Sequence, residues 1–208
     1  MKRTLLAVAI ATICVVSAHA QGAVGSISLK PMVGGTLTSV YGNDVIAAKM
    51  KIGLVAGAEM TYQVSPIFAV SGGGLYTMQG YGVDQQYDPK MKLDYLNIPI
   101  MLSCYVAPGF AIKAGVQPGI LLSARASESG NGVSADIDIK DWYNTVDVSI
   151  PVGISYEIKQ FVIDARYCLG LTKTEKTSGT FMGETYQNNA NNVRNSVFML
   201  TVGYNIPL

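Results

Sequence analysis

Residues 147–167 read DVSIPVGISYEIKQFVIDARY, and this stretch carries the pattern that decides the fold. Up to Glu157, polar or small residues alternate with Val, Ile or Tyr, as in a half-buried β-strand. After Lys159-Gln160 the alternation resumes in the opposite phase, as a two-residue hairpin turn requires. Asp164 and Arg166 then lie in an apolar run, where a charge is costly unless it is paired or hydrated. The stretch predicts one hairpin with an apolar face and a face that carries charges.

The first 20 residues have the features of an export signal. Lys2 and Arg3 precede an apolar core over residues 5–16, which is short for a membrane span of about 20 residues. Ala18-His19-Ala20 is a small-residue cleavage site. We expect residues 1–20 to be a signal peptide for the general secretory route, and residues 21–208 to form one outer-membrane β-barrel domain.

The composition of the remaining chain is unusual for an exported protein. Without Lys2 and Arg3 it holds 13 basic residues (15 − 2) and 14 acidic ones, a net charge of −1 and no basic excess for nucleic acid. Charged residues make up 14% of the chain, against about 25% in soluble domains. No apolar run is long enough for a membrane helix, so a closed β-barrel is the structure expected to cross a bilayer.

Period-two alternation recurs in eight segments that we predict to be strands: 26–38, 50–64, 67–79, 92–106, 109–125, 143–158, 161–172 and 196–207. Three connections are tight, at Ser65-Pro66, Ala107-Pro108 and Lys159-Gln160. Four are long, at 39–49, 80–91, 126–142 and 173–195. Because short and long connections alternate, we predict an all-β, eight-stranded antiparallel up-and-down transmembrane barrel with short periplasmic turns and long extracellular loops.

The two faces of the strands indicate which side meets lipid. A soluble barrel of the lipocalin kind also alternates, with its apolar side inward. Here the polar face is mainly small residues, which suit the narrow interior of an eight-stranded barrel rather than a water-exposed surface. Aromatic residues of the apolar face also gather in two groups, as at the two interfaces of a bilayer: Tyr62, Phe68, Phe110, Tyr156, Phe161 and Tyr204 near the turns, and Tyr76, Trp142 and Phe198 near the loops.

The charges of the polar face are then expected inside the barrel, where they must be paired to persist. We predict that they form a structural salt-bridge network, with a proton or ion path as the alternative. The set comprises Lys30, Lys51, Glu59, Lys113, Arg125, Asp147, Glu157, Asp164 and Arg166. Four prolines inside predicted strands cannot donate to a ladder, so we expect bulges near Pro31, Pro99, Pro118 and Pro151.

A strand, turn and strand over residues 92–124 resemble a known family. Tyr95, Leu96, Ile98 and Pro99 precede the turn, and Gly115, Pro118 and Gly119 follow it. In these residues, and in the segments ARYCLGLT (165–172) and LTVGYNIPL (200–208), the chain resembles the PorT-like family of outer-membrane β-barrel proteins. The resemblance implies an eight-stranded barrel in a Gram-negative outer membrane, with no general set of catalytic residues. Outer-membrane barrels usually end in an aromatic residue, whereas this chain ends in Leu208.

A sealed lumen and polar loops predict a non-enzymatic scaffold or partner-binding protein. Its partners would be outer-membrane lipid, the barrel assembly machinery during biogenesis, and an envelope or extracellular protein bound through the loops. Phe181 and Tyr186, in the longest loop, are candidate contacts. A narrow pore or a transport or secretion accessory protein is the alternative. An enzyme at the rim is disfavoured because His19 is the only histidine, although Asp136, Asp138 and Asp141 offer carboxylates. No cofactor or metal site is predicted.

Overall fold

The structure is a computed structural model that describes residues 23–42, 48–83, 90–130, 133–174, 178–181, 184–187 and 193–208. The expected signal peptide lies outside these residues. No helix of the described chain has the length and apolarity that a membrane span needs. The elements are β1 (Ile27–Tyr41), β2 (Ala48–Gln63), β3 (Phe68–Val83), β4 (Lys90–Asn97), β5 (Ile100–Ala107), β6 (Phe110–Gly130), β7 (Val133–Asp138), the short 3₁₀ turn η2 (Lys140–Trp142), β8 (Val146–Ile158), β9 (Phe161–Gly170), β10 (Ser178–Phe181), β11 (Glu184–Gln187), β12 (Arg194–Tyr204) and β13 (Ile206–Pro207).

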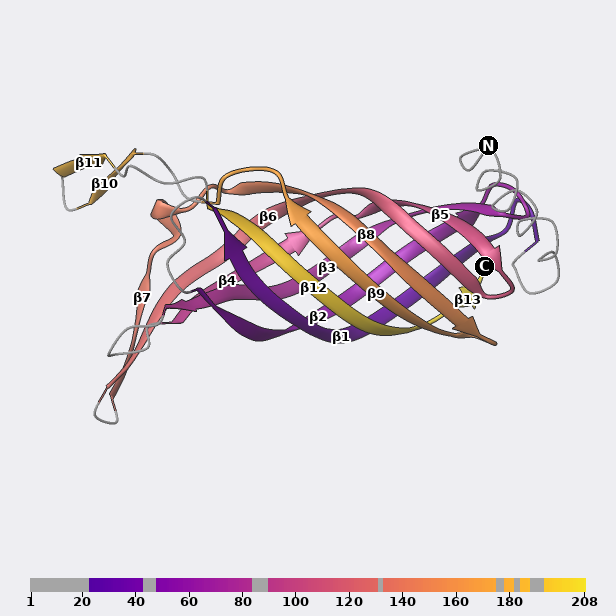
Figure 1. Cartoon of the computed structure of the whole chain (residues 1–208), viewed down its shortest axis with the longest axis horizontal. Helices are drawn as coiled ribbons and strands as arrows, with labels where there is room; N and C mark the ends of the chain where they lie inside the picture. The colour runs from indigo at the N-terminus through magenta and orange to yellow at the C-terminus, as the bar shows by residue number, and fades with distance from the viewer. Residues whose placement is uncertain are drawn as a thin grey trace, which may run out of the picture.

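The strands close into a ring, which Figure 1 shows as a tilted wall around one long axis. β4 and β5 occupy one position in the wall, so the order around it is β1, β2, β3, β4 with β5, β6, β8, β9 and β12. Each neighbouring pair is antiparallel, and β12 pairs with β1 to close the barrel. The predicted eight-stranded up-and-down barrel is confirmed.

Three tight turns join strands at one end of the barrel. Ile158 pairs with Phe161 across Lys159-Gln160, as predicted, and Lys159 has a φ of 57°. The second turn consists of Pro108-Gly109 instead of Ala107-Pro108, because Ala107 still pairs with Phe110. Gly109 has a φ of 72°, a backbone conformation that glycine adopts without steric cost.

The opposite end holds two hairpins that the sequence pattern did not predict. β7 lies in the expected loop 126–142 and pairs with the extension of β6 from Arg125 to Gly130. In Figure 1 this extension projects beyond the wall at the loop end. β10 and β11 form a separate two-stranded sheet within the expected loop 173–195. These strands have four to six residues each, too few for alternation to distinguish them from an irregular loop.

The alternation of faces follows the prediction along most strands. In β2, Leu54 is 61% exposed whereas the next residue, Val55, is fully buried in the interior. Both groups of aromatic residues lie on the outer surface, with Tyr156 and Phe161 exposed near the turns and Tyr76 and Trp142 exposed near the loops. The apolar face therefore points outward and the small and polar face fills the barrel.

The prediction of bulges at the prolines is wrong for three of them. Pro31, Pro118 and Pro151 keep a register partner in a neighbouring strand without a register shift beside them. At Pro99 the strand itself is interrupted, between β4 and β5, and Gly73 N–H donates to the Pro99 carbonyl over 3.3 Å. A proline removes one backbone N–H donor from the strand. Its carbonyl and the backbone groups of its neighbours can still form the hydrogen bonds of the ladder.

Gly153 offers a test of how tightly the wall is packed around the inner charges. A β-carbon added to Gly153 would lie 2.3 Å from the Ala165 carbonyl oxygen and 3.1 Å from Cγ of Arg166. We predict that Gly153→Ala lowers the free energy of unfolding by about 1–3 kcal/mol, because the backbone of β9 must shift. Urea unfolding in detergent, followed by the fluorescence of Trp142, measures this change.

The matched control is Gly35→Ala, whose added β-carbon has only one neighbour within 4 Å, the Gly53 carbonyl oxygen at 3.8 Å. This variant is expected to unfold within about 0.5 kcal/mol of the wild type. Equal unfolding curves for both variants would show that the β8–β9 wall has room beside Arg166.

Candidate functional site

Five charged side chains from four strands meet inside the barrel. Glu59 of β2 is fully buried and accepts hydrogen bonds from both terminal nitrogens of Arg166 in β9, with Nη2–Oε2 at 2.9 Å. Lys30 of β1 lies 3.1 Å from the same carboxylate. Lys113 of β6 donates to Asp164 of β9 over 2.7 Å and lies 3.8 Å from Glu59. We call these five residues the lumen cluster.

Arg166 connects the two carboxylates of the lumen cluster. The Arg166 Nε donates to Asp164 Oδ1 over 2.5 Å, and Nη2 donates to Asp164 Oδ2 over 3.0 Å. The same guanidinium group also donates to the Glu59 carboxylate. All five side chains are at most 7% exposed, so water screens these charges little. Three cations against two carboxylates leave a formal charge of +1, and the removal of any member would leave a buried charge without its partner.

The local sequence explains how β9 brings Asp164 and Arg166 to one place. The two residues are two apart in a strand, so both point inward on the same face. Arg166 pairs in register with Gly153 across the hairpin, and Asp164 pairs with Ser155. Because this glycine and this serine are small, they leave space on the inner face of β8 for the long Arg166 side chain. The side chain crosses the lumen and reaches Glu59 on β2.

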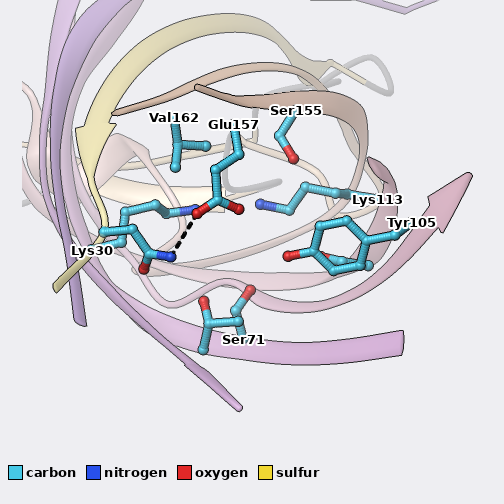
Figure 2. A pocket seen from close by; sticks show the side chains of 10 residues that line it. Lys30, Ser71, Tyr105, Lys113, Ser155, Glu157 and Val162 are labelled. Carbon is cyan, nitrogen blue, oxygen red and sulfur yellow. Dashed lines mark hydrogen bonds between the residues drawn. The ribbon is translucent and has the colours of Figure 1, made fainter. Parts of the chain in front are cut away.

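A polar cavity of about 30 Å³ adjoins the lumen cluster, with space for roughly two water molecules. Figure 2 shows Lys30, Lys113 and Glu157 directed toward it, with Tyr105 and Ser71 around its margin. Asn205 Nδ2 donates to Glu157 Oε1 over 2.8 Å, which is the dashed line of Figure 2. The Ser71 hydroxyl is buried and has no hydrogen-bond partner among the described residues. Water bound in the cavity would satisfy these groups.

An apolar group fills the lumen beyond the lumen cluster. Its six members come from five strands and are all at most 5% exposed. We call it the apolar plug, and it consists of Met32, Val55, Leu75, Cys168, Val197 and Met199. A second apolar group, Leu93, Tyr95, Leu121, Ala124 and Tyr143, lies on β4, β6 and the segment before β8. Side chains therefore occupy successive levels of the interior, as expected for eight strands.

Three further residues of the predicted network lie elsewhere in the interior. Asp147 accepts hydrogen bonds from Thr172 and, over 2.8 Å, from Asn195. Glu157 borders the cavity, and the Lys51 ammonium donates to the Gln79 carbonyl over 2.7 Å. Eight of the nine predicted residues thus divide into a five-residue cluster and three separate side chains.

Arg125 was expected in the lumen, and the structure places it on the exposed outer surface. Asp94 pairs with Ser123 while Tyr95 pairs with Leu121, so Leu122 is an extra residue in β6. This bulge inverts the alternation, and the buried residue that follows is Ala124. Lys140 Nζ donates to the freed Leu122 carbonyl over 3.0 Å.

Sequence reasoning missed the neutral partners of the inner carboxylates. Asn205, Asn195 and Thr172 hold Glu157 and Asp147, and each lies on an inward-facing position or at the end of a strand. Their inward phase was visible in the alternation, but their partners depend on neighbouring strands. Phe181 and Tyr186 belong to β10 and β11, where Tyr186 pairs with Gly179 in register.

The chemistry that these groups offer is pairing and hydration. Asp138, suggested as part of a rim carboxylate site, accepts a hydrogen bond from the Lys140 N–H over 2.9 Å at the surface. Within the described part of the chain, no three His, Cys, Asp or Glu side chains are arranged to hold a metal ion. No disulfide joins Cys104 and Cys168.

The substitution Arg166→Leu tests whether the lumen cluster stabilises the barrel, and Arg125→Leu is its matched control. We predict that Arg166→Leu lowers the free energy of unfolding by about 3–5 kcal/mol, because Glu59 and Asp164 lose their shared partner. Arg125→Leu, on the outer surface, should change it by less than about 0.5 kcal/mol. Urea titration in detergent is the measurement, and equal effects of the two substitutions would contradict a paired cluster.

Comparison with known proteins identifies the family. Residues 19–176 match a family model described as "Outer membrane protein beta-barrel domain". Two crystal structures of Ail, the attachment invasion locus protein of Yersinia pestis, one in complex with the heparin analogue sucrose octasulfate, align at 16% and 15% identity. Each alignment covers 88% of this chain and 100% of the other, with TM-scores of 0.52 and 0.50, so the likeness concerns the fold. No curated protein sequence matches. The chain therefore belongs to the family of outer-membrane protein β-barrel domains and is located in the Gram-negative outer membrane.

Proposed function

We propose that the chain is a non-enzymatic scaffold of the outer membrane, whose barrel holds the loops at the cell surface for a protein partner. An N-terminal signal over residues 1–20 would deliver it through the general secretory route, and the barrel assembly machinery would insert it. In this proposal the barrel supplies a rigid anchor, and the loops supply recognition.

The packed interior is the observation that carries the proposal. The lumen cluster ties β1, β2, β6 and β9 together, and the apolar plug occupies the lumen beyond it. An ion that crossed would have to separate buried pairs and pass apolar side chains. Both steps are costly, which favours a structural role for the inner charges over a pore.

The loop end supports a recognition role. β6 and β7 extend one hairpin beyond the wall, and β10 with β11 forms a second hairpin in the longest loop. Hairpins carry a defined backbone, so residues on them are presented at less entropic cost than on an irregular loop. Phe181 and Tyr186 remain our candidate contacts, because aromatic residues often dominate binding surfaces.

Within the outer-membrane barrel family, we propose a relationship to the PorT-like group. The motif residues Ile98 and Pro99 form the interruption between β4 and β5, and the Pro118 carbonyl accepts a hydrogen bond from Ile98 N–H over 2.8 Å. The motif therefore has a structural role, because this hydrogen bond joins the interrupted strand β4–β5 to β6.

An enzymatic role has little chemical support in the sequence. The expected mature chain has no histidine, which is the commonest general base for serine and water nucleophiles. The cations near the inner carboxylates are held in buried pairs, where a substrate has no room.

The conductance of the purified barrel tests the sealed lumen. In planar bilayers we expect single-channel current no greater than that of protein-free membranes, since the lumen cluster and the apolar plug occupy the interior. A heat-modifiable band on cold SDS gels confirms that the inserted protein is folded. Stepwise currents from folded protein would favour the alternative of a narrow pore or a transport accessory.

Replacement of residues 178–187 by a Gly-Ser linker of equal length tests the loop role. We expect the variant to retain the heat-modifiable band and to lose the crosslinked partner that the wild type captures in native envelopes. A second variant replaces residues 128–135, at the tip of the β6–β7 hairpin, in the same way, because this hairpin is the other proposed recognition element. Equal crosslinking by the wild type and both variants would contradict recognition through the loops.

A further inference from the structure

An apolar groove crosses the outer wall where the barrel closes. It has a volume of about 500 Å³, within the range of about 300–1,000 Å³ typical of ligand pockets. The groove spans β1, β2, β12 and the start of β9, so it lies across the pairing of the first and last wall strands. Its main lining residues are Pro31, Val33, Ala56, Phe161, Val202 and Tyr204.

The groove is hollow because its floor is built from compact residues. Ala56 is a compact outward residue of β2, whereas several other outward positions of this strand carry Leu, Ile or Met. Beside it, the backbone of the inward-facing residues Gly57 and Gly203 lines the groove. At one end Phe161 and Tyr204 stand edge to face, with ring centroids 5.2 Å apart. The floor and this aromatic pair together form a channel open to the surroundings of the wall.

The backbone ladder is also interrupted beneath the groove. β1 pairs with β12 from Met32 onward and with β13 at Ser28 and Leu29. No register pair joins Lys30 and Pro31 to these two strands, and the Pro31 nitrogen cannot donate. The groove therefore lies over the place where the pairing of the first and last wall strands is incomplete.

The position of the groove identifies the kind of molecule that can fill it. It continues the exposed aliphatic face, which lipid covers in the outer membrane. Phe161 and Tyr204 lie beside the turn at Lys159-Gln160, the end that is periplasmic in barrels of this class. Lys159 is an exposed cation at the same end, two residues before Phe161, and complements a lipid phosphate.

We propose that this groove binds one acyl chain of a phospholipid from the periplasmic leaflet, with the phosphate on the side of Lys159. The site would hold this lipid more firmly than the lipids around the rest of the wall. The bound chain would pack against apolar side chains of β1, β2 and β12 at once, and would thereby stabilise the joint between β1 and β12.

Native mass spectrometry of the full-length mature barrel, purified in mild detergent from outer membranes, tests this proposal. We expect the wild type to retain one phospholipid per barrel. Ala56→Trp places an indole in the groove and should remove most of the retained lipid. Ala114→Trp is the matched control, because Ala114 is an exposed alanine on β6 of the opposite wall, and it should retain lipid like the wild type.

Val33→Trp provides a second way to fill the groove, and a heat-modifiable band establishes that each variant analysed is folded. Lys159→Glu should lower lipid retention while leaving the barrel folded. Equal retention by all folded variants would mean unspecific surrounding lipid and would overturn the proposal. A lipopolysaccharide mass would overturn it as well, and so would a dimer of the chain that Ala56→Trp abolishes.

Discussion

The fork of Arg166 between Glu59 and Asp164 is the interaction on which the interior depends. It joins β9 to β2 across the lumen, and Lys30 and Lys113 add β1 and β6 to the same network. Buried charges are expensive to desolvate, so the network fixes the register of four strands as well as their distance. A slip of one residue in the register of a strand would point its inward charges toward the lipid.

Much of this arrangement was predictable from the hairpin at 147–167. Its alternation and phase change gave the pairing of Gly153 with Arg166 and of Ser155 with Asp164, because period two fixes the side of every residue. Arg125 was misplaced for the same reason. The consecutive Leu121 and Leu122 break the alternation, and a bulge there moves every later residue of β6 to the other face. Partners across the lumen could not be predicted, since they depend on the curvature of the closed barrel.

The structure separates the barrel into regions with different tasks. The wall meets lipid, with a groove at its closing seam. The interior combines a charged level, a small polar cavity and an apolar level, which favours rigidity over passage. The two hairpins at the loop end extend beyond the wall or lie in the expected long loop. This division suits a scaffold, because a rigid anchor allows the loops to be recognised without the cost of ordering the whole chain.

The thiol of Cys168 in the apolar plug reports directly on whether side chains seal the lumen. In a variant that lacks residues 1–20 and carries Cys104→Ser, Cys168 is the single cysteine, and it is 2% exposed. A small, charged thiosulfonate reagent should modify it rapidly in urea and leave it unmodified in the folded barrel, as measured by intact mass. Rapid modification of the folded barrel would mean that water and ions reach the interior, and would contradict the sealed lumen.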